Sequence, residues 1–131
     1  MIIKRAKYGN TKVIVDGVKF DSKLELYLYN ALKNNELDFD FQVNIELVPK
    51  FRFQKENIRA IGMRVDFLLR HNHKEIFIDT KGFATSDAKM KYKMLKFKFK
   101  DQPSTYIIWL KTQKDVNAFI FNLKTKDYEP K

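Results

Sequence analysis

Two short stretches of the sequence hold side chains that could bind a metal ion and act on a phosphate ester: Val65-Asp66-Phe67 and Ile78-Asp79-Thr80-Lys81. Apolar side chains alternate with other residues from Met63 to Arg70, and a similar alternation runs from Glu75 to Lys81. A period of two predicts a β-strand in each range. Residues 71–74 between them are polar and predict a tight turn, so the two strands should form a hairpin.

The register of this hairpin determines which side chains face each other. A turn centred between Asn72 and His73 pairs Arg70 with Glu75, Leu68 with Phe77, Asp66 with Asp79, and Arg64 with Lys81. Directly opposed Cβ atoms lie about 4.5–5.5 Å apart, and two carboxylates about 4 Å apart repel by roughly 4 kcal/mol at an effective dielectric constant near 20. A purely structural hairpin would avoid this aspartate pair. A divalent cation would convert the repulsion into coordination, and oxygen ligands with a phosphate substrate suit Mg²⁺.

The residues around the pair complete a hydrolytic site. Phosphodiester hydrolysis needs a metal that binds the phosphate and acidifies a water molecule. Asp66 and Asp79 can supply two oxygen ligands, and the backbone carbonyl of Thr80 could supply a third. Lys81 lies on the same side of the strand as Asp79, so its ammonium group could orient the water or offset charge on the phosphate. Glu25, in the first turn of a predicted helix, could bind a second metal or hold a water on the metal.

Each of these residues also has an ordinary structural explanation. Glu25 could serve only as the capping-box partner of Ser22. The two aspartates could form a solvated charged face with Arg64 and Lys81. The pattern His71-x-His73 resembles a metal pair, but its position in a turn and the absence of cysteine favour a solvated turn.

Composition and charge limit the class of protein. With 131 residues, of which 44% are apolar, the chain has the size of one globular domain over 1–131. It has no cysteine, its apolar N-terminus is too short for a signal peptide, and no apolar run approaches the roughly 20 residues of a membrane span. We therefore expect a cytoplasmic protein with no membrane contact. A net charge of +10 indicates an anionic partner, most often nucleic acid, although a merely basic soluble protein would look the same.

The remaining sequence predicts an α/β (α+β) fold with a mixed sheet flanked by helices. Before the central hairpin we expect a hairpin over 12–20 with an Asp16-Gly17 turn, a helix from Asp21-Ser22 to Asn34, strands over 41–48 and 51–55, and a loop over 54–58. After it we expect a helix from Thr85-Ser86 to about Lys100, a strand over 105–110 buried on both faces, and a helix from Thr112. The inward side of that last helix consists of Val116, Phe119, Ile120 and Leu123, and residues 124–131 should form a loose tail.

The helix predicted to end near Lys100 carries three stripes. A basic stripe consists of Lys89, Lys93, Lys96 and Lys100, and could either follow DNA phosphates or be an ordinary exposed face. A narrow apolar stripe consists of Ala88, Tyr92, Leu95 and Phe99. A second apolar face consists of Met90, Met94 and Phe97, and for it we favour burial within the chain over contact with a second subunit. Trp109 should be a core residue rather than a base-stacking one.

These motifs resemble those of a known superfamily. Asp66 followed by Asp79-Thr80-Lys81 resembles the PD-(D/E)xK nuclease signature, and Glu25 is similar to the helix glutamate of many members. The closer resemblance is to small phage-encoded endonuclease-like proteins, through the motifs Lys7-Tyr8-Gly9-Asn10, Asp21-Ser22-Lys23-Leu24-Glu25 and Asp79-Thr80-Lys81-Gly82-Phe83. Val65 stands where the signature often has proline, a residue without a chemical role.

The resemblance implies a restriction-endonuclease-like core and Mg²⁺-dependent DNA cleavage, with Mn²⁺ able to substitute. It also relates the chain to phage Holliday junction resolvases and to the transposon-end nuclease subunit, and therefore to DNA recombination in the host cytoplasm. We accordingly expect a DNA endonuclease in which Asp66 and Asp79 bind metal, Lys81 positions the water, and Glu25 completes the site.

The sequence contains no recognition helix or zinc module for reading bases, so selectivity should come from branched or junction DNA. Two cuts at a junction would require two active sites, and hence a homodimer. The alternatives are a non-catalytic basic DNA-binding module and an interaction subunit of a larger nuclease or transposase assembly.

Overall fold

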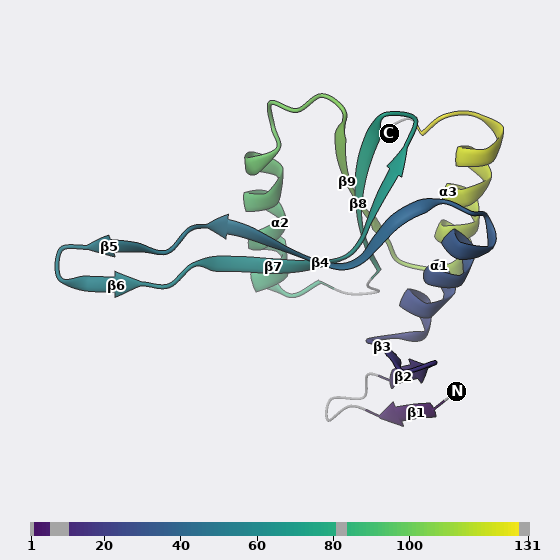
Figure 1. Ribbon diagram of the computed structural model, residues 1–131, viewed down its shortest axis with the longest axis horizontal. Helices are drawn as coiled ribbons and strands as arrows, with labels where there is room; N and C mark the ends of the chain where they lie inside the picture. Colours follow the sequence, from purple (N-terminus) through teal and green to yellow (C-terminus); the bar gives the residue numbers. More distant parts are fainter. Residues whose placement is uncertain (1, 6–10, 81–83, 129–131) are drawn as a thin grey trace. The chain divides into compact units, whose positions relative to one another are not determined.

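The computed structural model describes residues 2–5, 11–80 and 84–128, and for residues 2–5 and 11 only the backbone is described. Within these ranges three helices and nine strands form an α+β fold with a mixed sheet, as the sequence predicts (Figure 1). No helix in the described ranges is long and apolar enough to cross a membrane. The motif residues 7–10 and 81–83, and with them Lys81, lie outside the described residues.

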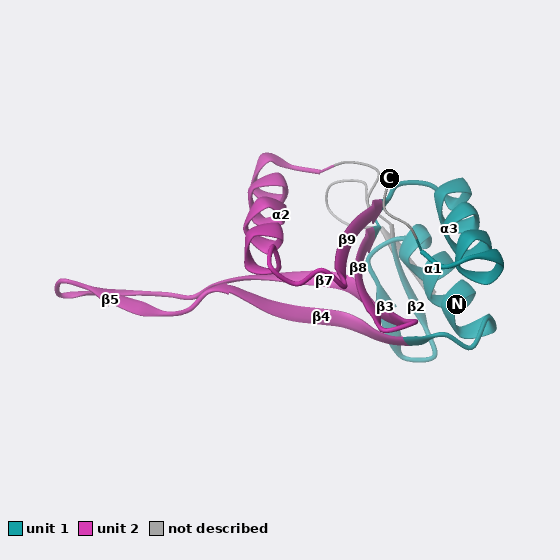
Figure 2. Cartoon of the chain, turned by 90° about the horizontal axis from the view of Figure 1, so that it is seen from above, with its two compact units in different colours: residues 1–38, 80–82, 110–131 teal, residues 39–79, 83–109 magenta. Residues whose placement is uncertain are grey.

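The chain divides into two compact units, shown in different colours in Figure 2. Unit 1 comprises residues 1–38, 80–82 and 110–131, and unit 2 comprises residues 39–79 and 83–109.

Unit 1 contains a three-stranded antiparallel sheet with β2 in the middle: β1 (Ile2–Arg5), β2 (Thr11–Val15) and β3 (Val18–Phe20). Asp16 and Gly17 form the turn between β2 and β3, with φ angles of 52° and 78°. Positive φ at both central residues matches the twist of a two-residue hairpin, and glycine adopts it without steric cost. The hairpin predicted over 12–20 is therefore confirmed, whereas β1 is an addition that the sequence pattern does not predict.

Two helices complete unit 1: α1 (Lys23–Asn34) and α3 (Gln113–Thr125). Both begin where the sequence predicts, because an N-cap hydroxyl accepts a backbone N–H of the first turn. Ser22 accepts from Glu25 at 3.1 Å, and Thr112 accepts from Asp115 at 3.1 Å. Thr112 and Asp115 form a complete capping box.

The buried face of α3 is the predicted one, formed by Val116, Phe119, Ile120 and Leu123. On α1, Leu28 and Leu32 are fully buried. The helix α3 continues to Thr125, so it includes two residues of the segment predicted to be a loose tail. Beyond it, the ring centroid of Tyr128 lies 6.0 Å from that of Phe119. Residues 129–131 lie outside the described residues.

Unit 2 is built around a four-stranded sheet in the order β4-β7-β8-β9. Its strands are β4 (Asp38–Val48), β7 (Ile61–His71), β8 (Lys74–Thr80) and β9 (Thr105–Leu110). The predicted hairpin is confirmed, since β7 and β8 are antiparallel with Arg70 opposite Glu75 and Leu68 opposite Phe77.

The connection from β8 to β9 makes this sheet mixed. The backbone N–H of Glu75 donates to the carbonyl of Ser104 at 2.9 Å, so both strands start at the same end of the sheet and run in the same direction. Parallel neighbours need a crossover, which is helix α2 (Ser86–Lys98). As predicted, α2 begins after the N-cap residue Thr85, whose hydroxyl accepts the N–H of Ala88 at 3.1 Å.

The core of unit 2 lies between α2 and the sheet, and its buried members are Val65, Leu68, Phe77 and Leu95. Six partly buried apolar side chains pack against them: Val43, Ile45, Leu47, Met63, Phe99 and Ile107. Full burial of a side chain such as Leu95 contributes about 1.5–3 kcal/mol. These contacts therefore fix α2 against the sheet.

Two burial predictions for unit 2 are wrong. The sequence predicts that the strand over 105–110 is buried on both faces, but residues 105–109 are only half-buried because β9 is the last strand of the sheet. The sequence also favours burial of the second apolar face of α2. In the structure this is wrong for Met90 and Phe97, which are 53% and 70% exposed because α2 packs on the sheet through its other side, whereas Met94 is half-buried.

Beyond the sheet, the chain between β4 and β7 forms a narrow ribbon, seen at the far end of unit 2 in Figures 1 and 2. This segment, residues 49–60, is called the arm, and it contains β5 (Phe51–Phe53) and β6 (Glu56–Ile58) in antiparallel pairing. The loop predicted over 54–58 is therefore wrong for residues 56–58. Pairing with β5 outweighs the polar composition that favours a loop, and the turn is confined to Gln54 and Lys55.

Candidate active site

The candidate site is centred on two aspartates on neighbouring strands of unit 2. Asp66 on β7 is 6% exposed, and Asp79 on β8 is fully buried. Phe67 on β7 pairs with Ile78 on β8, and the aspartates are the next residue on each strand. The backbone N–H of Asp66 donates to Oδ1 of Asp79 at 3.1 Å. The structure thus brings together the two carboxyl residues that the sequence places opposite each other. Burying a carboxylate is costly unless it is hydrogen-bonded, paired or bound to a metal, so this placement needs a specific explanation.

Tyr92 on α2 belongs to this site, although its helical spacing predicts only a place in the narrow apolar stripe. Its hydroxyl donates a short hydrogen bond to Oδ2 of Asp79, the carboxylate oxygen that the Asp66 N–H does not contact. Asp79 is therefore held from two sides, by strand β7 and by helix α2. This double contact fixes the orientation of its carboxylate.

The pKa of the Tyr92 hydroxyl is raised well above its ordinary value. Burial of the side chain is the largest cause, followed by the hydrogen bond to Asp79 and then by the negative charges of Asp79 and Asp66. Each of these effects disfavours the phenolate. Tyr92 therefore stays protonated at neutral pH and remains a hydrogen-bond donor to Asp79.

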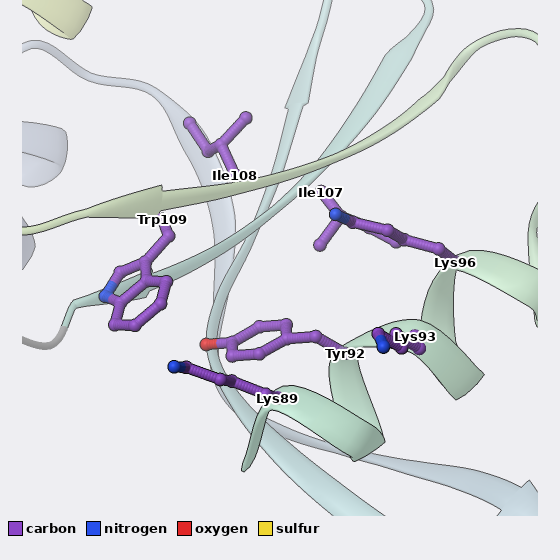
Figure 3. A pocket seen from close by; sticks show the side chains of 7 residues that line it. All are labelled: Lys89, Tyr92, Lys93, Lys96, Ile107, Ile108 and Trp109. Carbon is purple, nitrogen blue, oxygen red and sulfur yellow. The ribbon is translucent and has the colours of Figure 1, made fainter. Parts of the chain in front are cut away.

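Beside Tyr92, α2 and β9 border an open groove of about 390 Å³ (Figure 3). The residues that line it are Lys89, Tyr92, Lys93, Lys96, Ile107, Ile108 and Trp109. The rings of Tyr92 and Trp109 stack with centroids 5.7 Å apart and planes at 19°. Trp109 is half-buried, so it packs as a core residue would and also lines the groove. Since Tyr92 contacts both Trp109 and Asp79, it connects the groove with the aspartate pair.

Three lysines of the predicted basic stripe line the α2 side of this groove: Lys89, Lys93 and Lys96. All three are exposed, and none forms an ion pair with another residue in the described part of the chain. In contrast, Lys91 on the same helix lies 3.6 Å from Asp87. The groove therefore presents uncompensated positive charge beside an aromatic surface.

Lys100, the fourth lysine of the predicted stripe, does not line the groove. Because α2 ends at Lys98, residue 100 no longer continues the helical spacing. Its ammonium group lies 2.9 Å from Asp101 and 5.5 Å from the ring centroid of Phe97.

The other predicted site residues are described separately. Glu25 on α1 belongs to unit 1 and is 1% exposed, and its Oε2 accepts the backbone N–H of Asp21 at 2.5 Å. Its carboxylate thus contacts the chain just before the N-cap Ser22, one residue earlier than a capping box requires. Thr80, next to Asp79, is 5% exposed. Lys81 lies outside the described residues, and its role stays a prediction.

The donor set fits a hard divalent cation. Within the described ranges, no group of three or more His, Cys, Asp or Glu side chains is placed to hold a metal ion. Mg²⁺, however, is usually bound through one or two carboxylates together with waters and substrate phosphates. Asp66 and Asp79 lie on neighbouring strands, joined by the hydrogen bond from the Asp66 backbone N–H to Asp79, and they match that requirement in the number and type of their donor groups.

By fold and site, the chain is an α+β protein whose mixed sheet carries two buried carboxylates beside a basic groove. A family model described as "Protein of unknown function (DUF1064)" matches residues 5–115, and the chain belongs to that family. The match includes both aspartates, the arm and all of α2. No curated protein and no solved structure matches the chain.

One signal in the sequence could have identified Tyr92. A tyrosine on the inner side of a helix must find a partner for its hydroxyl when it is buried. In a helix that follows directly after Asp79 and crosses back over the sheet, the nearest acceptors are the carboxylates of the hairpin. Trp109 carried no such signal, because only the position of β9 at the end of the sheet leaves its indole partly uncovered.

Proposed function

We propose that this chain is a metal-dependent endodeoxyribonuclease of the PD-(D/E)xK type, which hydrolyses phosphodiester bonds during phage DNA recombination or processing. The observation that carries the proposal is the buried pair of Asp66 and Asp79 on adjacent strands. The groove next to it, with three exposed lysines, supports DNA as the substrate. The net charge of +10 supports the same class of partner.

The DNA backbone would bind along the α2 side of the groove. Phosphate contacts by lysines supply affinity and position the duplex without reading its sequence. Lys89, Lys93 and Lys96 are suited to this role because no acidic side chain among the described residues pairs with them. Selectivity would then depend on DNA shape, such as a branch or a junction.

Asp66 and Asp79 would hold Mg²⁺ or Mn²⁺, with the carbonyl of Thr80, the next residue in the chain, as a further ligand. The role of Glu25 stays a prediction from the sequence. When bound, the ion supplies a Lewis acid for the phosphate and lowers the pKa of water. Tyr92 keeps the Asp79 carboxylate in one orientation through its donated hydrogen bond. Lys81 would orient the attacking water and offset negative charge that develops on the phosphate.

One observation favours a second candidate, an interaction subunit of a nuclease or transposase assembly. Met90 and Phe97 on α2 are 53% and 70% exposed, so this apolar face could contact a second copy or another protein. Replacing both with serine should change the sedimentation behaviour of the chain if the face is an interface. A homodimer held through this face would also supply the two active sites that a junction requires.

The direct test is incubation of the purified chain with linear duplex, flap and four-way-junction DNA in EDTA, Mg²⁺ or Mn²⁺. The nuclease proposal predicts cleavage products only in the presence of a metal ion, with branched DNA preferred. DNA binding without cleavage under every metal condition would instead support the non-catalytic binding module. A strict monomer that cuts linear duplex at one sequence and ignores branches would exclude the resolvase-like form of the proposal.

A further inference from the structure

The arm exposes two aromatic rings to water. Phe51 and Phe53 on β5 are 49% and 61% exposed. They are two residues apart on one strand and therefore point to the same face of the ribbon, and Ile58 on β6 lies directly opposite Phe51. A two-stranded ribbon that extends past its sheet has no second layer to cover either face. The register also places Glu56 directly opposite Phe53, so the face that is available to a partner consists of three apolar side chains and one carboxylate.

The arm is also strongly basic. Residues 50–59 contain four basic side chains (Lys50, Arg52, Lys55 and Arg59) and one acidic side chain (Glu56), a net charge of 4 − 1 = +3. None of them forms an ion pair with another described residue. The Nε–H of Arg52 donates to the carbonyl of Gln54 at 3.2 Å, so its guanidinium lies beside the turn. Arg52 lies between the two rings in the sequence and by the same alternation points to the other face of the ribbon. The basic groups therefore flank the aromatic face.

These two properties together indicate the class of partner. A second copy of the arm would bring the same positive charge, so like charges would oppose pairing of two arms. Duplex DNA offers phosphates for the basic groups and base steps for the rings. Two-stranded ribbons enter DNA grooves, and apolar side chains such as phenylalanine act as wedges that unstack base pairs and kink the duplex from the minor groove.

We propose that the arm binds the minor groove of duplex DNA, with Phe51 and Phe53 as wedges between base steps and with the four basic side chains on the flanking phosphates. The proposal deepens the proposed function and rests on it, since the bound duplex is the DNA that the aspartate site would cut. It gives the chain a second DNA contact within unit 2. It also gives shape selectivity a physical origin, because a wedge enters most easily where base pairs are already bent or unstacked.

The test measures binding and bending of an unbranched 25-base-pair duplex in EDTA, so that no cleavage is required. Fluorescence anisotropy gives the Kd, and energy transfer between dyes on the two ends gives the bend. The variants are Phe51→Ala/Phe53→Ala, Arg52→Gln/Lys55→Gln, and a chain in which residues 50–59 are replaced by Asn-Gly. Phe121→Ala is the matched control, because Phe121 is 64% exposed on α3 and lies outside the arm.

The double phenylalanine variant should weaken duplex binding by at least roughly 5-fold, the lower end of the effect of losing one base–aromatic contact on single-stranded DNA, and should abolish the bend. The double basic variant should lower the slope of log K against log salt by about 2. Phe121→Ala should behave like the unmodified chain. Unchanged duplex affinity and bending after replacement of residues 50–59 would overturn the proposal.

An arm variant that alters the oligomeric state in sedimentation velocity, with unchanged DNA affinity per protomer, would also overturn the proposal and would make the arm a protein interface.

The test of the arm and the test of nuclease activity can fail separately. If the unmodified chain cuts no DNA with Mg²⁺ or Mn²⁺, the proposed activity fails, while loss of bending in the phenylalanine variant still establishes the arm as a DNA contact.

Discussion

Replacement of Tyr92 by phenylalanine removes one oxygen atom and leaves the ring. In the structure that oxygen donates to Oδ2 of Asp79, while the ring stacks on Trp109 with a centroid distance of 5.7 Å. The substitution therefore deletes the hydrogen bond and keeps the packing. The side chains of Tyr92 and Asp79 are both buried, so water cannot easily replace the lost donor.

The expected loss of stability follows from the kind of hydrogen bond that is removed. A hydrogen bond to a charged group contributes about 1.5–3 kcal/mol to folding. For a chain of this length, that loss lowers the melting temperature by roughly 5–15 °C. Tyr27→Phe is the matched control, because its hydroxyl donates to Asn117 at 2.6 Å in an exposed position between neutral side chains. A neutral hydrogen bond contributes only about 0.5–1.5 kcal/mol, so this control should shift the melting temperature less.

The same substitution should impair cleavage through the orientation of Asp79. Loss of a residue that orients a metal ligand typically lowers metal affinity or activity by about 10- to 100-fold. The Tyr92→Phe variant should therefore need more Mg²⁺ to reach half of its maximal rate, and Tyr27→Phe should not. The assay is a cleavage time course at increasing Mg²⁺. A Tyr92→Phe variant with the melting temperature and Mg²⁺ dependence of the unmodified chain would refute the positioning role of Tyr92.

The groove lysines, Glu25 and Leu95 give three further tests. Replacing the three groove lysines with glutamine should lower the slope of log K for DNA binding against log salt by about 2.7, at 0.9 per phosphate contact. Lys100→Gln should change the slope little, because Lys100 already pairs with Asp101. Equal changes in slope would show that the DNA does not bind along the groove. Glu25→Gln should lower the cleavage rate with little change in stability, because glutamine can still accept the N–H of Asp21. Full cleavage activity of this variant would support a purely capping role for Glu25. Leu95→Ala should destabilise the chain by about 2–5 kcal/mol in denaturant unfolding, since Leu95 is fully buried; a loss below about 1 kcal/mol would contradict the packing of α2 on the sheet.

The central hairpin could be predicted from sequence because local signals agree there. Alternation sets both strands, and the polar turn fixes the register that places Arg70 opposite Glu75. The helix starts were predictable for the same reason, since Ser22, Thr85 and Thr112 each satisfy a backbone N–H within three residues. Local chemistry was sufficient to predict these features.

Features that depend on distant neighbours could not be predicted in this way. Strand β6 is polar at Glu56 and Asn57, and only pairing with β5 makes it a strand. The exposure of Trp109 follows from the place of β9 at the end of the sheet, which no local pattern contains. The helical spacing predicts that Tyr92 lies on the inner side of α2, and the side chain is buried there. Its contact with Asp79 depends on how the crossover helix returns over β8.

The central claim is that Asp66 and Asp79 form a metal-dependent hydrolytic site. It is tested most directly by measuring cleavage of junction DNA with Mg²⁺ for the unmodified chain, Asp66→Ala and Asp79→Ala, alongside DNA binding in EDTA. We predict cleavage by the unmodified chain, none by either variant, and binding that persists or rises, because each variant removes a negative charge near the phosphates. Mg²⁺-dependent cleavage near the unmodified rate in either variant would contradict the assignment.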